Sequence, residues 1–173
     1  MKKALFLDRD GVINIEKNYL YKIEDFEFID GIMDLCTFYQ GQGYEIFVLT
    51  NQSGIARKYY TEDDFNIVTT WMIKEFAKKN IIISHVYFCP HHPSISGECD
   101  CRKPNTGMFL RAKKEYNLDL SQSIMIGDNE RDIEAGLNAG LRETYLFDIT
   151  QTIEHSKATK IVSKLQNIWK EKC

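Results

Sequence analysis

The sequence has few of the features that mark a membrane, secreted or nucleic-acid-binding protein. No apolar run approaches the roughly 18 residues that a membrane span needs. Residues 1–4 are basic, but too few apolar residues follow before Asp8 for a signal peptide. Lys and Arg number 22 against 25 Asp and Glu, so the basic excess typical of nucleic-acid binders is missing. We therefore expect a cytoplasmic protein that binds neither membrane nor nucleic acid.

Proline is also scarce, and no linker, internal repeat or low-complexity stretch interrupts the chain. Two of the three prolines, Pro90 and Pro93, fall in one cysteine-containing segment. The 173 residues are 43% hydrophobic and 27% charged, which is typical of a globular protein with a sizeable core. We expect a single domain over residues 1–173. No exposed apolar stripe is evident, so we also expect a monomer.

Short apolar runs alternate with helical patterns along the chain. The patterns predict strands over 4–7, 45–49, 81–88, 123–126 and 143–147, and helices over 31–40, 62–79, 107–116, 131–139 and 156–170. Thr61 and Asp64 have the spacing of a capping box at the start of helix 62–79. The alternation predicts an α/β fold, with a mostly parallel sheet covered by helices on both faces.

Polar residues follow three of the predicted strands. Asp8 and Asp10 come directly after strand 4–7, residues 50–54 follow strand 45–49, and residues 127–129 follow strand 123–126. An acidic pair alone is also typical of a solvated turn. Ligands bind beyond the carboxyl ends of parallel strands, so the three segments together predict a site at one edge of the sheet.

The residue types in this predicted site suit chemistry on a phosphate. The carboxylate of Asp8 could attack phosphorus, and Asp10 could protonate the leaving oxygen and later activate water. Asp128 adds a further carboxylate for a hard cation such as Mg²⁺. Thr50 and the amides after it could hold a phosphoryl oxygen, and Lys103 is the candidate to balance the negative charge.

Three of the five cysteines cluster within thirteen positions. Cys36 falls in a helical pattern and is expected in the core, and Cys173 is terminal. In a reduced cytosolic chain the clustering of Cys89, Cys99 and Cys101 favours a metal over a disulfide.

With one imidazole, these thiols would form a closed tetrahedral Cys₃His zinc site, which is a structural type of site. His91 is the preferred fourth ligand, because Cys89 and His91 have the same spacing as Cys99 and Cys101, and His92 is its rival. The segment ends at Arg102 and Lys103, so zinc would fix a loop of about 89–103 and direct both cations at the phosphate site.

The order of these motifs resembles that of the haloacid dehalogenase (HAD) superfamily of phosphatases. The motifs are residues 8–13, 50–52, 103–104 and 127–132, and they span most of the chain. The resemblance implies a Rossmann-like core. It also implies Asp8 as the nucleophile that forms an aspartyl-phosphate, Asp10 as general acid and base, and Thr50 and Lys103 as phosphoryl-binding residues. Mg²⁺ would be held by the Asp8 side chain, the Asp10 main-chain carbonyl and Asp128.

Two further residues of these motifs have expected positions but no assigned chemistry. Asp132 is expected near the metal rather than on it. Arg9 is expected to point away from the two aspartates on either side of it, or to brace the loop by pairing with an acid.

A narrower resemblance comes from residues 26–31, 50–57 and 89–104. These are similar to the D-glycero-D-manno-heptose 1,7-bisphosphate 7-phosphatases, which lack a large cap domain. That family implies removal of the 7-phosphate from a phosphorylated sugar, and Asn129 stands where its members can carry a lysine. The implied substrate contacts are Glu16, Lys17, Asn18, Tyr19, Asn51, Gln52, Ser53, Arg102 and Asn129.

Two alternatives stay open at this point. Histidinol-phosphate phosphatases share the zinc loop, so the substrate could be histidinol phosphate. The chain could also be a catalytically inactive zinc-loop module that recruits nucleic acid or protein. The filled catalytic positions and the acidic net charge weigh against this second alternative.

Overall fold

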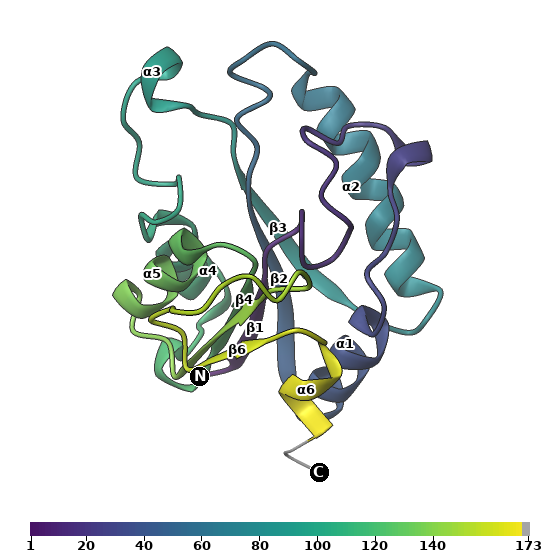
Figure 1. The fold of residues 1–173 in the computed structure, drawn as a ribbon, viewed down its shortest axis with the longest axis vertical. Coiled ribbons are helices and arrows are strands. Elements are labelled where there is room, and N and C mark those ends of the chain that lie inside the picture. Colours follow the sequence, from purple (N-terminus) through teal and green to yellow (C-terminus); the bar gives the residue numbers. More distant parts are fainter. Residues whose placement is uncertain (171–173) are drawn as a thin grey trace.

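The computed structural model describes residues 1–170 and has one parallel sheet at its centre. The strands are β1 (Lys3–Leu7), β2 (Tyr44–Asn51), β3 (Ile83–Cys89), β4 (Ile124–Gly127), β5 (Glu143–Phe147) and β6 (Lys160–Val162). Their spatial order is β3-β2-β1-β4-β5-β6, and all neighbours run parallel (Figure 1). The chain builds outward from β1 in one direction and then in the other, so a switch point lies between β1 and β4. Cys173 lies outside the described residues.

Helices cover both faces of this sheet, as predicted (Figure 1). On one face lie α1 (Ile32–Gly41), α2 (Glu62–Ala77) and α6 (Gln166–Trp169), and on the other α4 (Gly107–Tyr116) and α5 (Glu130–Asn138). The short helices η1 (Ile23–Asp25), α3 (Pro93–Ser96) and η2 (Leu120–Gln122) lie in connections. No helix within residues 1–170 has both the length and the apolarity to cross a bilayer.

The alternation of side chains along β1 divides the core into two layers. Leu5 and Leu7 pack in the layer under α1 and α2, whereas Ala4 and Phe6 pack in the layer under α4 and α5. All four are fully buried. A strand that is covered on both faces reads as a continuous apolar run, which is why the pattern of residues 4–7 identified it.

The predicted helix over 156–170 is wrong. The structure has β6 and the short helix α6 there, with Thr159 and Lys160 aligned beside β5. Without β6, the backbone N–H and C=O groups along the outer side of β5 would have no strand partner. The hydrogen bonds that β6 makes with β5, together with the β-branched residues Ile161 and Val162, outweigh the helical pattern of the segment.

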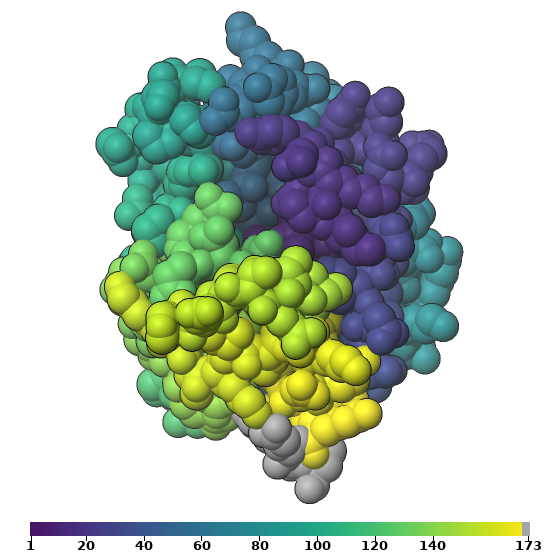
Figure 2. Space-filling model, in the orientation of Figure 1, coloured from purple at the N-terminus to yellow at the C-terminus, as the bar shows by residue number. Residues whose placement is uncertain are grey.

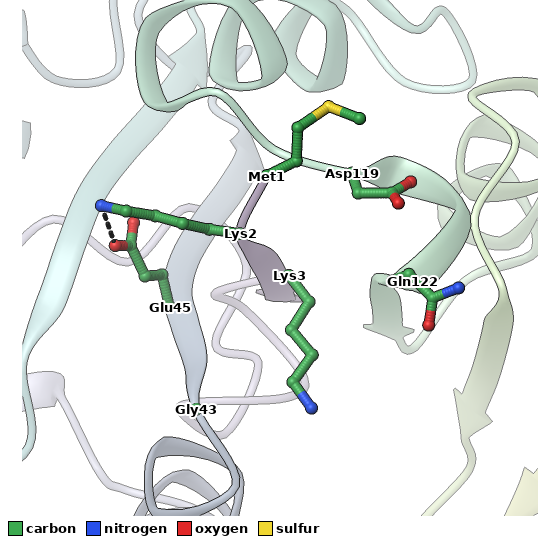
Figure 3. A pocket seen from close by; sticks show the side chains of 7 residues that line it. All are labelled: Met1, Lys2, Lys3, Gly43, Glu45, Asp119 and Gln122. Atoms are coloured by element: carbon green, nitrogen blue, oxygen red, sulfur yellow. Dashed lines mark ion pairs between the residues drawn. The ribbon is translucent and has the colours of Figure 1, made fainter.

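The amino-terminal edge of the sheet carries a hollow of about 440 Å³. Its lining comes from the starts of β1 and β2 and from the segment before β4, and consists of Met1, Lys2, Lys3, Gly43, Glu45, Asp119 and Gln122 (Figure 3). Lys2 and Glu45 form an ion pair of 2.6 Å on one side of it (Figure 3). The residues of the predicted site all lie at the opposite edge.

Candidate active site

Two acidic residues meet where β1 and β4 end. The backbone N–H of Asp8 donates to the carbonyl of Ile126 at 3.0 Å, which continues the pairing of the two strands to the point where Asp128 follows. Carboxylate oxygens of Asp8, Asp128 and Asp132, which we call the acidic cluster, all lie within 4.8 Å of one another. Gly11 lets the loop close over them, because it has a φ of +88° and a Cβ there would lie 2.0 Å from Asp128 Oδ2.

Lys103 is the buried cation of this cluster. Its ammonium donates to Asp8 Oδ1 and Asp132 Oδ1 at 2.8 Å each, and to the carbonyl of Leu49 at 2.6 Å. The Asn51 side chain holds the Lys103 backbone through two reciprocal hydrogen bonds of 3.1 Å. All three N–H donors of the ammonium are therefore used, and its position is fixed from both ends.

The acidic cluster carries more buried negative charge than Lys103 compensates. Burial raises the pKa of Asp8 well above its usual range, with Lys103 opposing the rise and Asp132 and Asp128 adding to it. Burial, and then the charge of Asp132, raise the pKa of Asp128 to about 7. Burial alone would lower the pKa of Lys103, but Asp132 and Asp8 outweigh it and raise that pKa. A cation among these oxygens would relieve the repulsion.

Asp132 is held by the start of helix α5. Its Oδ2 accepts from the backbone N–H of Asn129 at 3.1 Å, as part of a capping box, and its Oδ1 accepts from Lys103. The last residue of β4, Gly127, leaves no room for a side chain, since a Cβ there would lie 2.2 Å from that of Asp132. Both Asp132 oxygens thus have protein partners, which suits a position beside a metal rather than on it.

The Asp10 carboxylate accepts four hydrogen bonds from three side chains. Arg9 Nη2 and Asn14 Nδ2 donate to Oδ1, both at 3.0 Å. Arg9 Nε and Gln52 Nε2 donate to Oδ2, at 3.2 and 3.0 Å. Of the two expectations for Arg9, pairing with an acid is confirmed, and pointing away from both neighbouring aspartates is wrong. A further bond of 3.0 Å to the Leu20 carbonyl anchors its guanidinium in the core.

Cys89, His91, Cys99 and Cys101 form a second cluster, the cysteine cluster, at the end of β3. Cys101 Sγ lies 3.0 Å from Cys89 Sγ, 3.5 Å from Cys99 Sγ and 3.3 Å from His91 Nδ1. Four ligands around one zinc ion, with Zn–S of about 2.3 Å, lie roughly 3.5–4 Å apart. Cys89 Sγ lies 3.6 Å from both His91 Nδ1 and Cys99 Sγ, within this range, and the separations of 3.0 and 3.3 Å from Cys101 Sγ are shorter than it. The set of three thiols and one imidazole fits a tetrahedral zinc site with no open position.

His92 is turned away from the cysteine cluster. Its Nε2 lies 2.9 Å from Arg57 Nη2, and its Nδ1 faces the backbone N–H of Ser94 at 3.3 Å at the start of α3. Partial burial, together with the nearby charges of Arg57 and Arg102, lowers the pKa of His92. Of the two histidines, the structure brings only His91 to the sulfur atoms.

A polar cavity of about 540 Å³ opens above the acidic cluster, between the loop after β1, the loop after β2 and the cysteine segment (Figure 2). Of the predicted substrate contacts, eight line it: Glu16, Asn18, Tyr19, Asn51, Gln52, Ser53, Arg102 and Asn129. Thr50 and Lys103 lie beneath it, in a small recess with Asp8 and Asp132.

Lys17 is the exception among the predicted contacts. Its ammonium pairs with Glu27 at 3.4 Å, and it does not line the cavity. Glu16 and Asn18 on either side face the cavity, and adjacent residues in an irregular loop seldom point the same way. Four further residues line the cavity that were not among the predicted contacts: Arg57, Tyr60, His92 and Arg131. Arg57 and Arg131 lie within the quoted motifs, and their positive charge was the signal that could have found them.

Comparisons with known proteins agree with this architecture. A family model described as HAD-hydrolase-like matches residues 100–147. The structure of D,D-heptose 1,7-bisphosphate phosphatase from B. bronchiseptica, complexed with magnesium and phosphate, superposes with a TM-score of 0.83 and 26% identity, covering 96% of this chain and 95% of that one. The fold is thus the Rossmann-like fold of the HAD hydrolases, and no large cap domain is inserted within residues 1–170.

Proteins of similar sequence show which family of HAD hydrolases the chain belongs to. The D-glycero-alpha-D-manno-heptose-1,7-bisphosphate 7-phosphatase of Campylobacter jejuni is 51% identical over 171 residues, which is 98% of this chain and 97% of that protein. The D-glycero-beta-D-manno-heptose-1,7-bisphosphate 7-phosphatase of Haemophilus influenzae is 45% identical over 150 residues, covering 84% of this chain and 82% of that protein. The chain therefore belongs to the heptose-1,7-bisphosphate 7-phosphatase family of HAD-like hydrolases. It is a phosphatase.

Proposed function

We propose that this phosphatase removes the 7-phosphate of D-glycero-D-manno-heptose 1,7-bisphosphate in a Mg²⁺-dependent reaction with an aspartyl-phosphate intermediate. The observation that carries the proposal is the position of Asp8, which lies 2.8 Å from Lys103 under a polar cavity. The chain around it is 51% identical, almost from end to end, to a relative named for this reaction.

The first step transfers the phosphoryl group to the protein. An Asp8 carboxylate oxygen attacks the phosphorus atom, and the bond from phosphorus to the sugar oxygen breaks. Asp10, protonated on a carboxylate oxygen that gives up one of its four hydrogen bonds, transfers that proton to the leaving oxygen, so the heptose 1-phosphate departs as an alcohol. Thr50 and Lys103 stabilise the phosphoryl oxygens, for which the Lys103 ammonium exchanges one of its present contacts.

The second step regenerates the enzyme. A water molecule attacks the phosphorus atom of the aspartyl-phosphate, and Asp10 takes a proton from that water. The bond between phosphorus and the Asp8 oxygen breaks, and inorganic phosphate leaves. Asp10 ends the cycle protonated and Asp8 ionised, which is the state that the first step requires.

The acidic cluster fits Mg²⁺ by its chemistry. Its donors are carboxylate oxygens, it opens into a polar cavity, and burial, together with the neighbouring carboxylates, raises the pKa values of Asp8 and Asp128. The side chains of Asp8 and Asp128 and the main-chain carbonyl of Asp10 would hold the ion. Bound Mg²⁺ would supply positive charge against the phosphate and the two carboxylates.

The cysteine cluster would hold Zn²⁺ in a structural role. Its ligands are Cys89, His91, Cys99 and Cys101, and Arg102 follows directly and donates to the carbonyl of His91 at 3.2 Å. A metal at this position would fix the segment that carries Arg102 and Lys103 into the site. Zinc-binding thiols must be reduced, which agrees with the cytoplasmic location expected from the sequence.

The cavity would take the sugar and its second phosphate. Glu16, Asn18 and Tyr19 would contact the heptose, and Asn51, Ser53 and Arg102 would lie nearer the phosphates. Burial and the charge of Asp10 raise the pKa of Glu16, so this acid is sensitive to a polar ligand beside it.

The decisive experiment measures phosphate release with Mg²⁺ from the α and β anomers of heptose 1,7-bisphosphate and from histidinol phosphate. We expect kcat/KM for one heptose anomer to exceed that for histidinol phosphate by at least about 100-fold, because the cavity is polar and can pair a second phosphate. Relatives named for each anomer match at similar identity, so this comparison also assigns the anomer. Preference for histidinol phosphate would overturn the proposed substrate, and the absence of Mg²⁺-dependent turnover would overturn the proposed chemistry.

We further propose that residues 1–173 act as one domain and as a monomer. Strand β1 contributes side chains to both core layers, so the chain cannot be divided into two parts that each have a core of their own. Size-exclusion chromatography with light scattering should give the mass of a single 20.2 kDa chain at assay concentration. A stable dimer would contradict this part of the proposal.

A further inference from the structure

Gln52 lines the cavity, yet its side-chain amide is engaged almost completely by the protein. Its Nε2 donates to Asp10 Oδ2 at 3.0 Å and to Thr50 Oγ1 at 2.9 Å. Its Oε1 accepts from the hydroxyl of Tyr60. Both amide hydrogens are therefore used, and only one lone pair of Oε1 is left. Gln52 is buried to 3% exposure, so it has little surface to offer a substrate.

Gln52 differs from the other partners of Asp10 in where it comes from. Arg9 and Asn14 belong to the same loop as Asp10 and would move with it. Gln52 follows β2, and among the described residues it supplies the one hydrogen bond that joins the Asp10 carboxylate to another strand end. The same amide group contacts Thr50, so it sets the distance between the proton-transfer group and a phosphoryl-binding group.

Tyr60 determines which end of the amide faces Asp10. Its hydroxyl donates to Oε1 and so leaves the NH₂ group to Asp10 and Thr50. The reverse orientation would place a carbonyl oxygen against a carboxylate. Burial raises the pKa of Tyr60 to about 12, so this hydroxyl keeps its proton at neutral pH. Its ring stacks on Tyr21, with centroids 5.5 Å apart, and lies so close to Gly54 that a Cβ there would meet it at 2.2 Å.

We infer that Gln52 and Tyr60 form a positioning pair that holds Asp10 in line with the leaving oxygen and directs the Thr50 hydroxyl at the phosphoryl group. Because Gln52 already donates to Thr50 Oγ1, the hydroxyl hydrogen of Thr50 remains available for a phosphoryl oxygen. The inference rests on the proposed role of Asp10 as general acid. It changes the expected role of Gln52 from a substrate contact to a residue that acts through Asp10 and Thr50.

The test uses the dependence of rate on the leaving group, with small aryl phosphates that make no sugar contacts. Phenol is the poorer leaving group and needs the proton from Asp10, whereas 4-nitrophenol leaves with little help. We expect Gln52→Met to raise the ratio of kcat/KM for 4-nitrophenyl phosphate over phenyl phosphate about 10-fold, and Tyr60→Phe about 3-fold. Tyr21→Phe removes a hydroxyl from the stacked partner ring and should leave the ratio unchanged.

The Asp10→Asn background separates this inference from the proposed function. There, Gln52→Met should leave the ratio unchanged, because the group that it positions is already absent. A uniform loss on both substrates at an unchanged ratio would mean that Gln52 only stabilises the fold, and would overturn the inference. If Asp10→Asn itself kept wild-type activity and ratio, the proposed mechanism would fail first. Thermal melting of each variant identifies any that do not fold, and if Gln52→Met is one of them, Tyr60→Phe carries the test, because it leaves the Gln52 side chain in place.

Discussion

The acidic cluster and the cysteine cluster gather metal-ligating side chains in opposite ways. The acidic cluster takes its carboxylates from the ends of β1 and β4 and from the first turn of α5, so it exists only when the sheet is formed. The cysteine cluster takes all four ligands from residues 89–101. The first is therefore a product of long-range topology, whereas the second needs only one segment to fold back on itself.

The two clusters also differ in how many of the ligands around a metal ion the protein side chains can supply. The cysteine cluster has a full set of four soft ligands and suits an ion that stays bound. The acidic cluster keeps surplus negative charge, and it borders a cavity where water and phosphate oxygens can complete a shell. From this difference we expect the cysteine cluster to contribute to stability and the acidic cluster to turnover, and four predictions test this expectation.

The largest expected effect is on activity, from Asp8→Asn. The amide keeps the size of the side chain but is a poor nucleophile, so we expect kcat to fall by at least about 10⁴-fold. The fold should be retained, as judged by circular dichroism. Asp34→Asn, an exposed position on α1, is the matched control and should behave like the wild type. Near-normal turnover by Asp8→Asn would remove Asp8 from the role of nucleophile.

The next largest effect is expected from Lys103→Met. The change leaves Asp8 and Asp132 buried without their cation, which should lower the free energy of unfolding by about 3–5 kcal/mol in the absence of Mg²⁺. Saturating Mg²⁺ should restore part of this loss, because it supplies positive charge to the same cluster. Urea unfolding with and without Mg²⁺ measures both the loss of stability and its recovery.

Lys157→Met is the control for this experiment. It removes an ion pair of 2.8 Å with Glu134 in which the lysine side chain is 67% exposed, so the free energy of unfolding should change far less than in Lys103→Met. Equal effects of the two lysine variants would show that the acidic cluster carries no special electrostatic cost.

The third prediction compares neighbouring histidines of the cysteine segment. His91→Gln should lose bound zinc and lower the melting temperature by about 5–10 °C, whereas His92→Gln should retain zinc at wild-type stoichiometry. Metal analysis of the purified proteins measures the content. Zinc loss from His92→Gln with full retention in His91→Gln would reverse the assignment of the fourth ligand.

The smallest effect is expected at Asp148, whose carboxylate accepts hydrogen bonds from residues that follow it in the chain. The side chain of Thr150, and then the backbone N–H of Ile153, donate to it and lower its pKa, the opposite of the shift in the acidic cluster. A lowered folded-state pKa contributes stability above the unfolded pKa, and this contribution is lost as the pH falls through the folded pKa.

Asp148→Asn should accordingly cost about 1–2 kcal/mol at pH 7, and this difference from the wild type should shrink as the pH falls below about 4. Urea unfolding across this pH range checks the direction. A difference that grows towards low pH would contradict the assigned sign.

Local patterns allowed much of the fold to be predicted. β5 (Glu143–Phe147) begins and ends where its apolar pattern does, and α2 begins at the residue after Thr61, whose capping box with Asp64 is present. The pattern failed at residues 156–170, where the open edge of β5 recruits a strand. A local reading cannot anticipate this, because the demand comes from hydrogen-bonding groups elsewhere in the chain.

The two groups of side chains that could hold a metal were predictable from the sequence alone. Cys89, Cys99 and Cys101 are close in the chain, and the order of strands and acids predicts that Asp8 and Asp128 meet at one edge of a parallel sheet. Both statements depend only on spacing and on the direction of strands, which local residue patterns encode.

The tertiary structure alone sets which partner each of these side chains contacts. It turns His92 to Arg57, pairs Lys17 with Glu27, and commits the Gln52 amide to Asp10 and Thr50. The physical reason is that each orientation depends on a hydrogen-bonding or charged partner from elsewhere in the fold. Hydrogen bonds are short and directional, so which partner a side chain meets is set only when the loops pack against one another.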